Sequence, residues 1–172
     1  MLSIVISGAG AVLLFYVPSS VGALLCAALC AQLRLLCNLL DGMVAIEGRR
    51  QSPTGALYNE IPDRIADSLL IVALGYAIHS PAIGWLGALA AAVTAYIRAL
   101  GGALRLPQDF RGPMAKPHRM AVLTAGCALG ALEMWLMGSQ WALVAAAWLI
   151  ALGSIVTCAT RTLAIARQLG VR

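Results

Sequence analysis

The sequence predicts an all-α integral membrane protein with six spanning helices, forming one domain over residues 1–172, with both termini on the cytoplasmic side. Three observations support this prediction. Of 172 residues, 61% are hydrophobic and 11% are charged, whereas a soluble domain carries about 25% charged residues. A spanning helix needs about 20 apolar residues, so six spans with short connections use nearly the whole chain. The basic residues also gather in alternate connections, as the topology requires.

The six predicted spans are apolar stretches separated by turn residues. Pro18 ends the first stretch, Pro81 separates the third from the fourth, and the Gly138–Ser139 pair separates the fifth from the sixth. The first stretch has no basic leader and no small-residue cleavage site, so we expect it to be retained as a span. The predicted spans lie at roughly 2–17, 20–46, 55–79, 82–101, 120–137 and 140–163.

The distribution of basic residues predicts the orientation. The two longer polar connections, at 47–54 and 102–119, and the C-terminal segment contain Arg and Lys, whereas the three short turns contain neither. Positively charged connections face the cytoplasm, so every basic segment and both termini fall on that side. The net charge of +5 is therefore a topology signal. Nucleic acid is excluded as a partner, because no basic domain lies outside the spans.

Several unusual residues within the spans are interpreted as structural. The five cysteines lie in apolar stretches without the spacing of a metal site and are expected to be packing residues. Arg34 is expected either to extend its charged end to the interface or to pair with a nearby acid. Glu133 lies near the outer end of the fifth span and is expected to be an interfacial side chain.

Three carboxylates lie inside or at the ends of strongly apolar stretches. Asp41, Asp63 and Asp67 fall within 27 residues, and even mild insertion scales assign about 2.5–3.5 kcal/mol to one Asp at the centre of a span. Such a group needs a partner. The clustering of three indicates a shared one, for which a divalent cation is the natural candidate.

Helical spacing places further oxygen donors beside these carboxylates. Asn38 shares one helical face with Asp41, and Asn59, Asp63 and Asp67 follow one another at intervals of four. Oxygen ligands without His or Cys suit Mg²⁺, Mn²⁺ or Ca²⁺ rather than zinc. The alternative is a purely structural network in which the acids pair with Arg64 or Arg98.

At these residues the sequence resembles the CDP-alcohol phosphotransferase family. The family pattern reads D-x-x-D-G-x-x-A-R, then eight residues, then G-x-x-x-D-x-x-x-D. Asp41, Gly42, Ala45, Gly55 and Asp63 match this pattern without a gap. The resemblance extends more loosely to a Tyr-x-Arg ending at Arg98 and to the basic segment from Lys116 to Arg119, and the expected six spans agree with the family.

Three positions depart from the family pattern. Asn38 and Asn59 stand where the first and third Asp are expected, and Ile46 replaces the Arg. An Asn carbonyl can bind a hard cation but contributes no charge. Asp67 and Glu60 are candidates to restore it. A slip of four residues would instead make Asp63 and Asp67 the third and fourth family acids. The number of bound ions, one or two, stays open.

The resemblance implies transfer of a substituted phosphate from a CDP-linked donor, such as CDP-diacylglycerol, to an alcohol acceptor in phospholipid synthesis, with release of CMP. It implies Asp63 as the general base, with Asp67 in reserve, an active site that faces the cytoplasm, and a homodimer. The resemblance implies that Mg²⁺ or Mn²⁺ is bound by Asn38, Asp41, Asn59, Asp63 and Asp67. It implies that the CDP group is bound by Asp41, Gly42, Ala45 and Gly55. An anionic acceptor is expected to be bound by Arg98, Lys116 and Arg119.

Two other function classes remain open at this point. Because two of the four acids are replaced by Asn, the chain is alternatively a family member that binds nucleotide or metal as a partner or scaffold without catalysis. A small ion-coupled transporter is the third hypothesis, because intramembrane acids also mark ion pathways. The clustering of the acids near one membrane face, without a repeat built around a midplane site, argues against transport.

Overall fold

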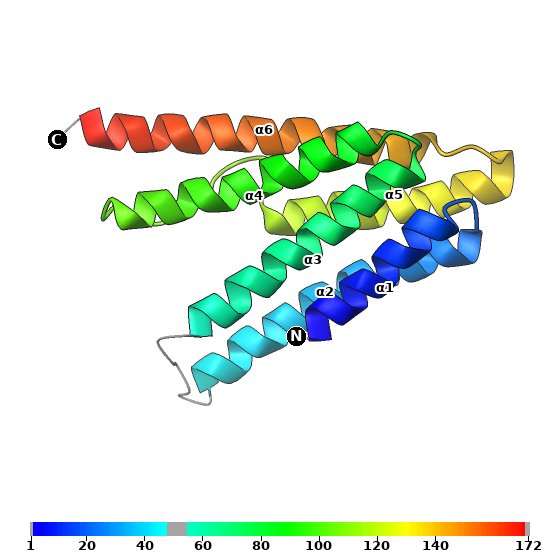
Figure 1. Ribbon diagram of the computed structural model, residues 1–172, viewed down its shortest axis with the longest axis horizontal. Helices are drawn as coiled ribbons and strands as arrows, with labels where there is room; N and C mark the ends of the chain where they lie inside the picture. The colour runs from blue at the N-terminus through cyan, green and yellow to red at the C-terminus, as the bar shows by residue number, and fades with distance from the viewer. Residues whose placement is uncertain (1, 48–54, 171–172) are drawn as a thin grey trace.

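The computed structural model describes residues 2–47 and 55–170, including the side chains except those of 41–47 and 55–59. These residues form an all-helical structure (Figure 1). Its elements are α1 (Leu2–Tyr16), α2 (Val21–Glu47), α3 (Gly55–Ala77), α4 (Pro81–Ala103), α5 (Lys116–Met137) and α6 (Trp141–Gly170).

Four of these helices are long and apolar enough to cross a membrane. They are α4, α5, α6 and the Val21–Leu40 part of α2. Helix α1 is apolar but has only 15 residues. The first half of α3 carries acidic and basic side chains that lower its hydropathy. The chain is thus an all-α membrane protein, and its predicted apolar stretches are confirmed as helices.

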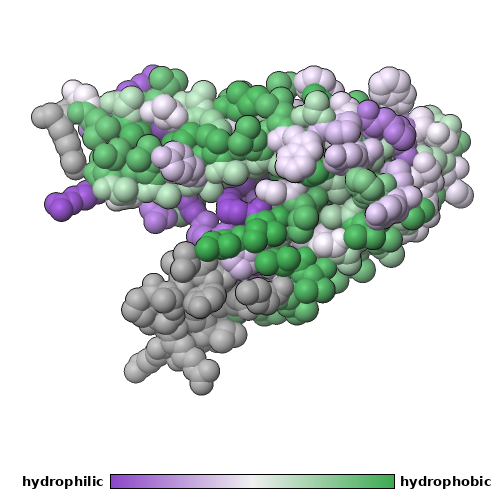
Figure 2. All heavy atoms as spheres, viewed as in Figure 1, coloured by the Kyte–Doolittle hydropathy of each residue, from purple (hydrophilic) through white to green (hydrophobic). Residues whose placement is uncertain are grey.

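The helices form a closed ring. Helix α1 packs against α2 and α3, α2 against α5, α5 against α6, α6 against α4, and α4 against α3. The interior of the ring is filled by side chains with almost no exposure, among them Leu70, Leu74, Leu123 and Ile150. Green, hydrophobic atoms also cover much of the outer surface in Figure 2, as expected for a bundle surrounded by lipid.

Small residues allow the helix backbones to approach closely. Gly75 of α3 and Gly84 of α4 meet backbone to backbone, so that a Cβ atom on Gly84 would lie 2.8 Å from the carbonyl oxygen of Val72 and 2.9 Å from the Cα of Gly75. A Cβ on Gly126 of α5 would lie 2.5 Å from the side chain of Ala146 of α6. Such contacts replace the hydrophobic effect as the source of helix association in lipid.

Two helices extend beyond the predicted spans by four residues or more. Helix α5 begins at Lys116, four residues earlier than predicted, with Pro117 in its first turn, where the missing N–H costs nothing. Helix α6 continues to Gly170, seven residues past the predicted end. Its last turns carry polar side chains, which a helix can accommodate outside an apolar layer. Helix α3 runs through Pro62.

The turn between α5 and α6 is fixed by Glu133. Gly138 ends α5 in the left-handed conformation, with φ of 67°. The Glu133 carboxylate accepts hydrogen bonds from the Ser139 hydroxyl (2.6 Å) and from the backbone N–H groups of Trp141 (3.1 Å) and Ala142 (2.8 Å). It therefore satisfies donors at the N-terminus of α6 that have no partner within the helix, a specific role beyond that of an interfacial side chain.

Candidate functional site

The polar side chains gather at one end of the ring, called the open end here, where α2, α4 and α6 end and α3 and α5 begin. Figure 2 shows purple, hydrophilic atoms in the notch between the α2–α3 pair and the α4–α6 pair. A cavity of about 430 Å³ lies there, lined by Glu60, Asp63, Arg64, Thr94, Ala95, Arg98, Phe110, Ala115, Lys116, Pro117, Arg119 and Arg161. Among the described residues that line it, five basic and two acidic side chains leave an excess of three positive charges. A hollow of about 530 Å³ elsewhere is apolar and carries no acid or base except tyrosine.

Asp67 is enclosed by arginine. Its Oδ1 lies 2.6 Å from Nη2 of Arg34 on α2, and its Oδ2 accepts a hydrogen bond of 3.0 Å from Nη2 of Arg119 on α5. Arg64 lies 3.9 Å away on α3 itself. The side chains of Arg34, Arg119 and Asp67 are 0%, 1% and 3% exposed. Asp67 thus joins three helices through a buried ion network and does not line the cavity.

Asp63, in contrast, lines the cavity and is the point where α2, α3 and α5 meet. Its Oδ1 accepts a hydrogen bond of 2.6 Å from Nδ2 of Asn38, and its Oδ2 accepts one from Lys116. Arg34 donates to the Asp63 backbone carbonyl at 3.1 Å and lies 3.6 Å from Oδ1. The structure therefore brings together the predicted residues Asn38 and Asp63 from two helices.

Glu60 and Arg98 form a second ion pair in the cavity wall. One Glu60 oxygen accepts a hydrogen bond from Nη2 of Arg98, and the other lies 3.7 Å from Nε of Arg64. The Arg98 guanidinium also lies 5.2 Å from the centre of the Phe110 ring, a cation–π distance. Arg98 was a candidate for acid pairing in the structural alternative, and its partner is Glu60.

The connection between α4 and α5, residues 104–115, is pinned to α6 and covers one side of the cavity. The Thr157 hydroxyl accepts a hydrogen bond of 2.9 Å from the Met114 N–H. Gly112 has φ of 128°, and a Cβ there would lie 2.4 Å from the Thr157 side chain. Arg161 donates to the carbonyls of Arg111 (2.8 Å) and Thr94 (2.9 Å). One face of α6 thus fixes this connection.

Asp109 forms local hydrogen bonds within the same connection. Its carboxylate accepts hydrogen bonds from Nε and the backbone N–H of Arg111, at 3.0 and 2.9 Å. Both bonds hold the pKa of Asp109 below its usual value, and the bond from the Arg111 side chain has the larger effect. The Arg111 side chain is 71% exposed and that of Asp109 is 10% exposed, and neither residue lines the cavity.

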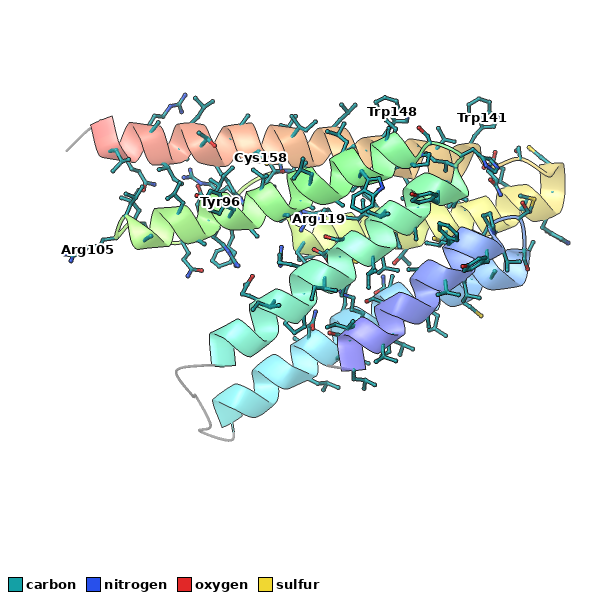
Figure 3. All side chains as sticks on the ribbon, in the orientation of Figure 1. Tyr96, Arg105, Arg119, Trp141, Trp148 and Cys158 are labelled. Atoms are coloured by element: carbon teal, nitrogen blue, oxygen red, sulfur yellow. The ribbon has the colours of Figure 1, made fainter. Side chains whose placement is uncertain are left out.

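The three residues predicted to bind the acceptor anion, Arg98, Lys116 and Arg119, line this one cavity. Arg119 extends from the N-terminal end of α5 (Figure 3) and also donates to the Met114 carbonyl at 2.8 Å. All three are paired in the structure, with Glu60, Asp63 and Asp67 respectively.

Part of the predicted site lies outside the described side chains. Asp41, Gly42 and Ala45 belong to the last turns of α2, and Gly55 and Asn59 to the first turns of α3. Their roles toward the CDP group and the metal stay predictions, as do those of Asn38, Asp63 and Asp67. Among the side chains that the structure describes, no group of three His, Cys, Asp or Glu has metal-site geometry.

Sequence reasoning missed Arg161 and the face of α6 to which it belongs. Arg161 was counted only as a C-terminal positive charge, yet it is 5% exposed and contacts two other segments. A signal was available, because Gly153, Thr157 and Arg161 recur every four residues on one helical face. Arg64 was named only as a pairing candidate and also lines the cavity.

Comparisons with known proteins support the family resemblance. No family model matches the chain. A phosphatidylinositol phosphate synthase of Streptomyces avermitilis is 29% identical in a match 139 residues long, which covers 76% of this chain and 57% of the relative. The match thus spans little more than half of the length of that protein.

Solved structures share the fold over nearly the whole chain. The phosphatidylinositol phosphate synthase of Mycobacterium tuberculosis in complex with manganese and citrate matches 95% of this chain and 79% of its own, with a TM-score of 0.75 and 23% identity. The same synthase with CDP-DAG bound matches 95% and 83%, with a TM-score of 0.76 and 23% identity. Sequence and fold therefore agree with the resemblance inferred from the motif.

Proposed function

We propose that the chain transfers a phosphatidyl group from CDP-diacylglycerol, or a similar CDP-linked donor, to an alcohol acceptor with an anionic group, and releases CMP. The observation that carries this proposal is the position of Asp63. Its carboxylate, in contact with Asn38 and Lys116, lies in the wall of a cavity with five basic side chains. One end of the ring thus offers a candidate base beside a binding place for anions.

The donor atoms at this end fit a hard divalent cation. Asn38 and Asp63 lie on two helices and are in direct contact through the Asn38 amide N–H. Both side chains carry oxygen atoms, and no sulfur or imidazole ligand belongs to the motif. Mg²⁺ or Mn²⁺ prefers such oxygen ligands, and we propose that Asn38, Asp41, Asn59 and Asp63 hold it. When bound, the ion would offset the charge of the donor diphosphate. Manganese in a synthase of the same fold supports this choice.

Asp63 is the proposed general base, because it lines the cavity and Asp67 does not. The acceptor oxygen attacks the phosphorus that carries diacylglycerol, and its proton passes to Asp63. The bond from this phosphorus to the CMP oxygen breaks, and CMP leaves with the electron pair. Asp67, held by Arg34 and Arg119, is assigned the task of fixing the helix that carries Asp63.

The anionic group of the acceptor has a second task in this scheme. Both Asp63 oxygens accept hydrogen bonds, from Asn38 and from Lys116. An acceptor phosphate offers Lys116 another partner, and an Asp63 oxygen is then free to receive the proton. Lys116 and Arg98 are therefore proposed to bind this group, with Arg119 supporting them from the buried network.

The membrane arrangement is part of the proposal. All six helices cross the bilayer, both termini and the active site face the cytoplasm, and a homodimer forms as the resemblance implies. The basic α4–α5 connection, residues 104–115, lies at the open end of the ring, and basic connections face the cytoplasm, which supports this orientation.

The first test is CMP release by purified protein in detergent. CDP-diacylglycerol, Mg²⁺ or Mn²⁺ and a panel of anionic alcohols are supplied, with Asp63→Asn as the inactive variant and Asp109→Asn as a matched control outside the cavity. Acceptor-dependent CMP that disappears with chelator and with Asp63→Asn would support the proposal. Nucleotide-dependent thermal stabilisation without CMP release would favour a binding protein, and metal-ion flux in sealed vesicles would favour a transporter.

A further inference from the structure

A second group of basic residues lies outside the cavity, where the α4–α5 connection meets the last turns of α6. An open hollow of about 480 Å³, called the surface hollow here, lies between these two segments. Its lining includes Gln108, Phe110 and Arg111 from the connection and Gln168 from α6. Among the described residues, Phe110 is the one that the surface hollow shares with the lining of the cavity.

Arg111 is fixed at two points within this hollow. Its backbone carbonyl accepts a hydrogen bond of 2.8 Å from Nε of Arg161, a side chain that is only 5% exposed. Its own Nε donates to both oxygens of Asp109, at 3.0 and 3.2 Å. The two Nη groups of Arg111 have no hydrogen-bond partner among the described residues. A guanidinium that is held at Nε and open at both Nη groups is prepared to bind a phosphate.

The surroundings of the surface hollow are positively charged. Arg105 and Arg167 are exposed, and Arg105 extends away from the bundle at the end of α4 (Figure 3). These two and Arg111 supply three positive charges against the single negative charge of Asp109. The described side chains therefore leave an excess of two positive charges here, which attracts anions.

The depth of the surface hollow favours a lipid over a soluble anion. Gln168 lies five residues beyond the predicted end of the sixth span, or about 7 Å along a helix. The headgroup layer on each side of the apolar core of a bilayer is about 5–7 Å thick. Exposed apolar side chains accompany the arginines, namely Leu104, Phe110 and Leu169, which are 40%, 63% and 42% exposed. A surface at this depth meets phospholipid headgroups and the first part of their acyl chains.

We propose that the surface hollow binds the headgroup of an anionic phospholipid. The lipid phosphate accepts hydrogen bonds from the Nη groups of Arg111, and the amide groups of Gln108 and Gln168 donate to it from either side of the hollow. The inference uses the proposed membrane arrangement but goes beyond the proposed function, because this lipid is bound at the surface and is not consumed.

The residues around the hollow explain the preference for an anionic lipid. Arg105 and Arg167 attract its net negative charge, whereas they repel the cationic group of a zwitterionic lipid that carries the same phosphate. Phe110 and Leu169 contact the glycerol and the adjoining acyl carbons, a contribution that a free headgroup lacks.

The test is native mass spectrometry of the protein in a neutral detergent, titrated with phosphatidylglycerol or phosphatidylcholine without CDP-linked donor or metal. We expect wild type to bind its first phosphatidylglycerol about tenfold more tightly than phosphatidylcholine. Arg111→Gln should lose about this factor for phosphatidylglycerol alone, because it removes a charge and a bidentate donor. Arg111→Lys, which keeps the charge without the fork, should lie between the two. Arg105→Gln and Arg167→Gln should each weaken binding by up to about fivefold.

Lys116→Gln is the matched control, because it removes the same charge from the cavity and should leave the affinity for phosphatidylglycerol unchanged. Hydrogen exchange locates the bound lipid independently of any substitution. Phosphatidylglycerol, but not phosphatidylcholine, should slow amide exchange in residues 104–113 and in the last turns of α6. Thermal unfolding of each variant is recorded to show that it is folded.

The outcomes separate this inference from the proposed function, because none of them depends on CMP release. Equal affinity of wild type for the two lipids, or unchanged affinity for phosphatidylglycerol in Arg111→Gln, would overturn the inference. A loss of affinity in Lys116→Gln with none in Arg111→Gln would place the anionic lipid in the cavity and would also overturn it. Tighter phosphatidylglycerol binding that depends on Arg111 would support the inference even if no acceptor yielded CMP.

Discussion

Replacing Asp67 or Asp63 by Asn should separate folding from catalysis within one turn of α3. The two carboxylates are neighbours on the same helical face, yet their surroundings differ. The Asp67 side chain is 3% exposed between two buried arginines, whereas that of Asp63 is 13% exposed in the cavity wall. We expect Asp67→Asn to lose stability and Asp63→Asn to lose activity.

The size of the effect at Asp67 follows from its two short contacts. Arg34 and Arg119 lie 2.6 and 3.0 Å from its oxygens, and Asp67→Asn leaves both buried guanidinium groups without this countercharge. Removing one member of a buried ion pair costs about 3–5 kcal/mol. For a chain of this length that corresponds to a fall in Tm of roughly 6–20 °C. Asp63→Asn breaks a more exposed contact with Lys116 and should cost less than about 2 kcal/mol.

The assay is thermal unfolding in detergent, followed by tryptophan fluorescence and combined with CMP release below the Tm of each variant. Asp109→Asn is the control, because the partner Arg111 is 71% exposed and Asn keeps an oxygen that can accept the Arg111 backbone N–H, so stability should change by less than about 1 kcal/mol. An Asp67→Asn protein that unfolds within 2 °C of wild type (about 1 kcal/mol or less) but releases no CMP would refute the structural assignment and make Asp67 the base.

Three further predictions concern packing, the α4–α5 connection and pH. Gly84→Ala should destabilise by about 1–3 kcal/mol, since its new methyl group meets backbone atoms of Val72 and Gly75; Gly102→Ala, on the same helix with open space around it, should be neutral or stabilising in the same melting assay. Thr157→Val should cost about 1–3 kcal/mol of folding stability and so lower the Tm, because the hydroxyl accepts the buried Met114 N–H that fixes the connection. The KM for the acceptor should also rise in this variant. Thr157→Ser, which keeps the hydroxyl, should restore both the Tm and the KM. The pKa of Asp109 is lower in the folded protein than in the unfolded chain. The ionised carboxylate therefore stabilises the fold fully above about pH 4, and this stabilisation is lost as the pH falls through the folded pKa. Chemical denaturation across this range should show a smaller acid-induced loss of stability in Asp109→Asn than in wild type, and an identical loss would contradict the assignment.

The helices were predictable because each one corresponds to a continuous apolar stretch of the sequence. Apolar stretches bounded by Pro18, Pro81 and Gly138 gave spans that agree with the observed helices to within a few residues. The largest error is the end of α6 at Gly170. Hydropathy reports where an apolar layer ends, whereas a helix ends where its backbone bonds end, and these two points differ when polar turns continue beyond the layer.

The site was predictable only where one motif contains it. The spacing of four placed Asn59, Asp63 and Asp67 on one face, but it did not distinguish the carboxylate in the cavity from the enclosed one. That difference depends on Arg34 and Arg119, which reach Asp67 from 33 and 52 positions away in the chain. Such pairings are set by the closure of the ring, which brings side chains of α2 and α5 to α3 although α3 packs mainly against α1 and α4, and no local pattern reports them.

The position of Asp67 in the ring has a consequence for how the protein is made. Arg34 and Asp67 both belong to the first three helices, so an early segment of the nascent chain already contains a neutral pair. Arg119 enters later, on α5, and its guanidinium finds its carboxylate only when the second half of the chain docks on the first. Because an unpaired charge in lipid is costly, this late pairing favours the docking of the second half of the chain on the first.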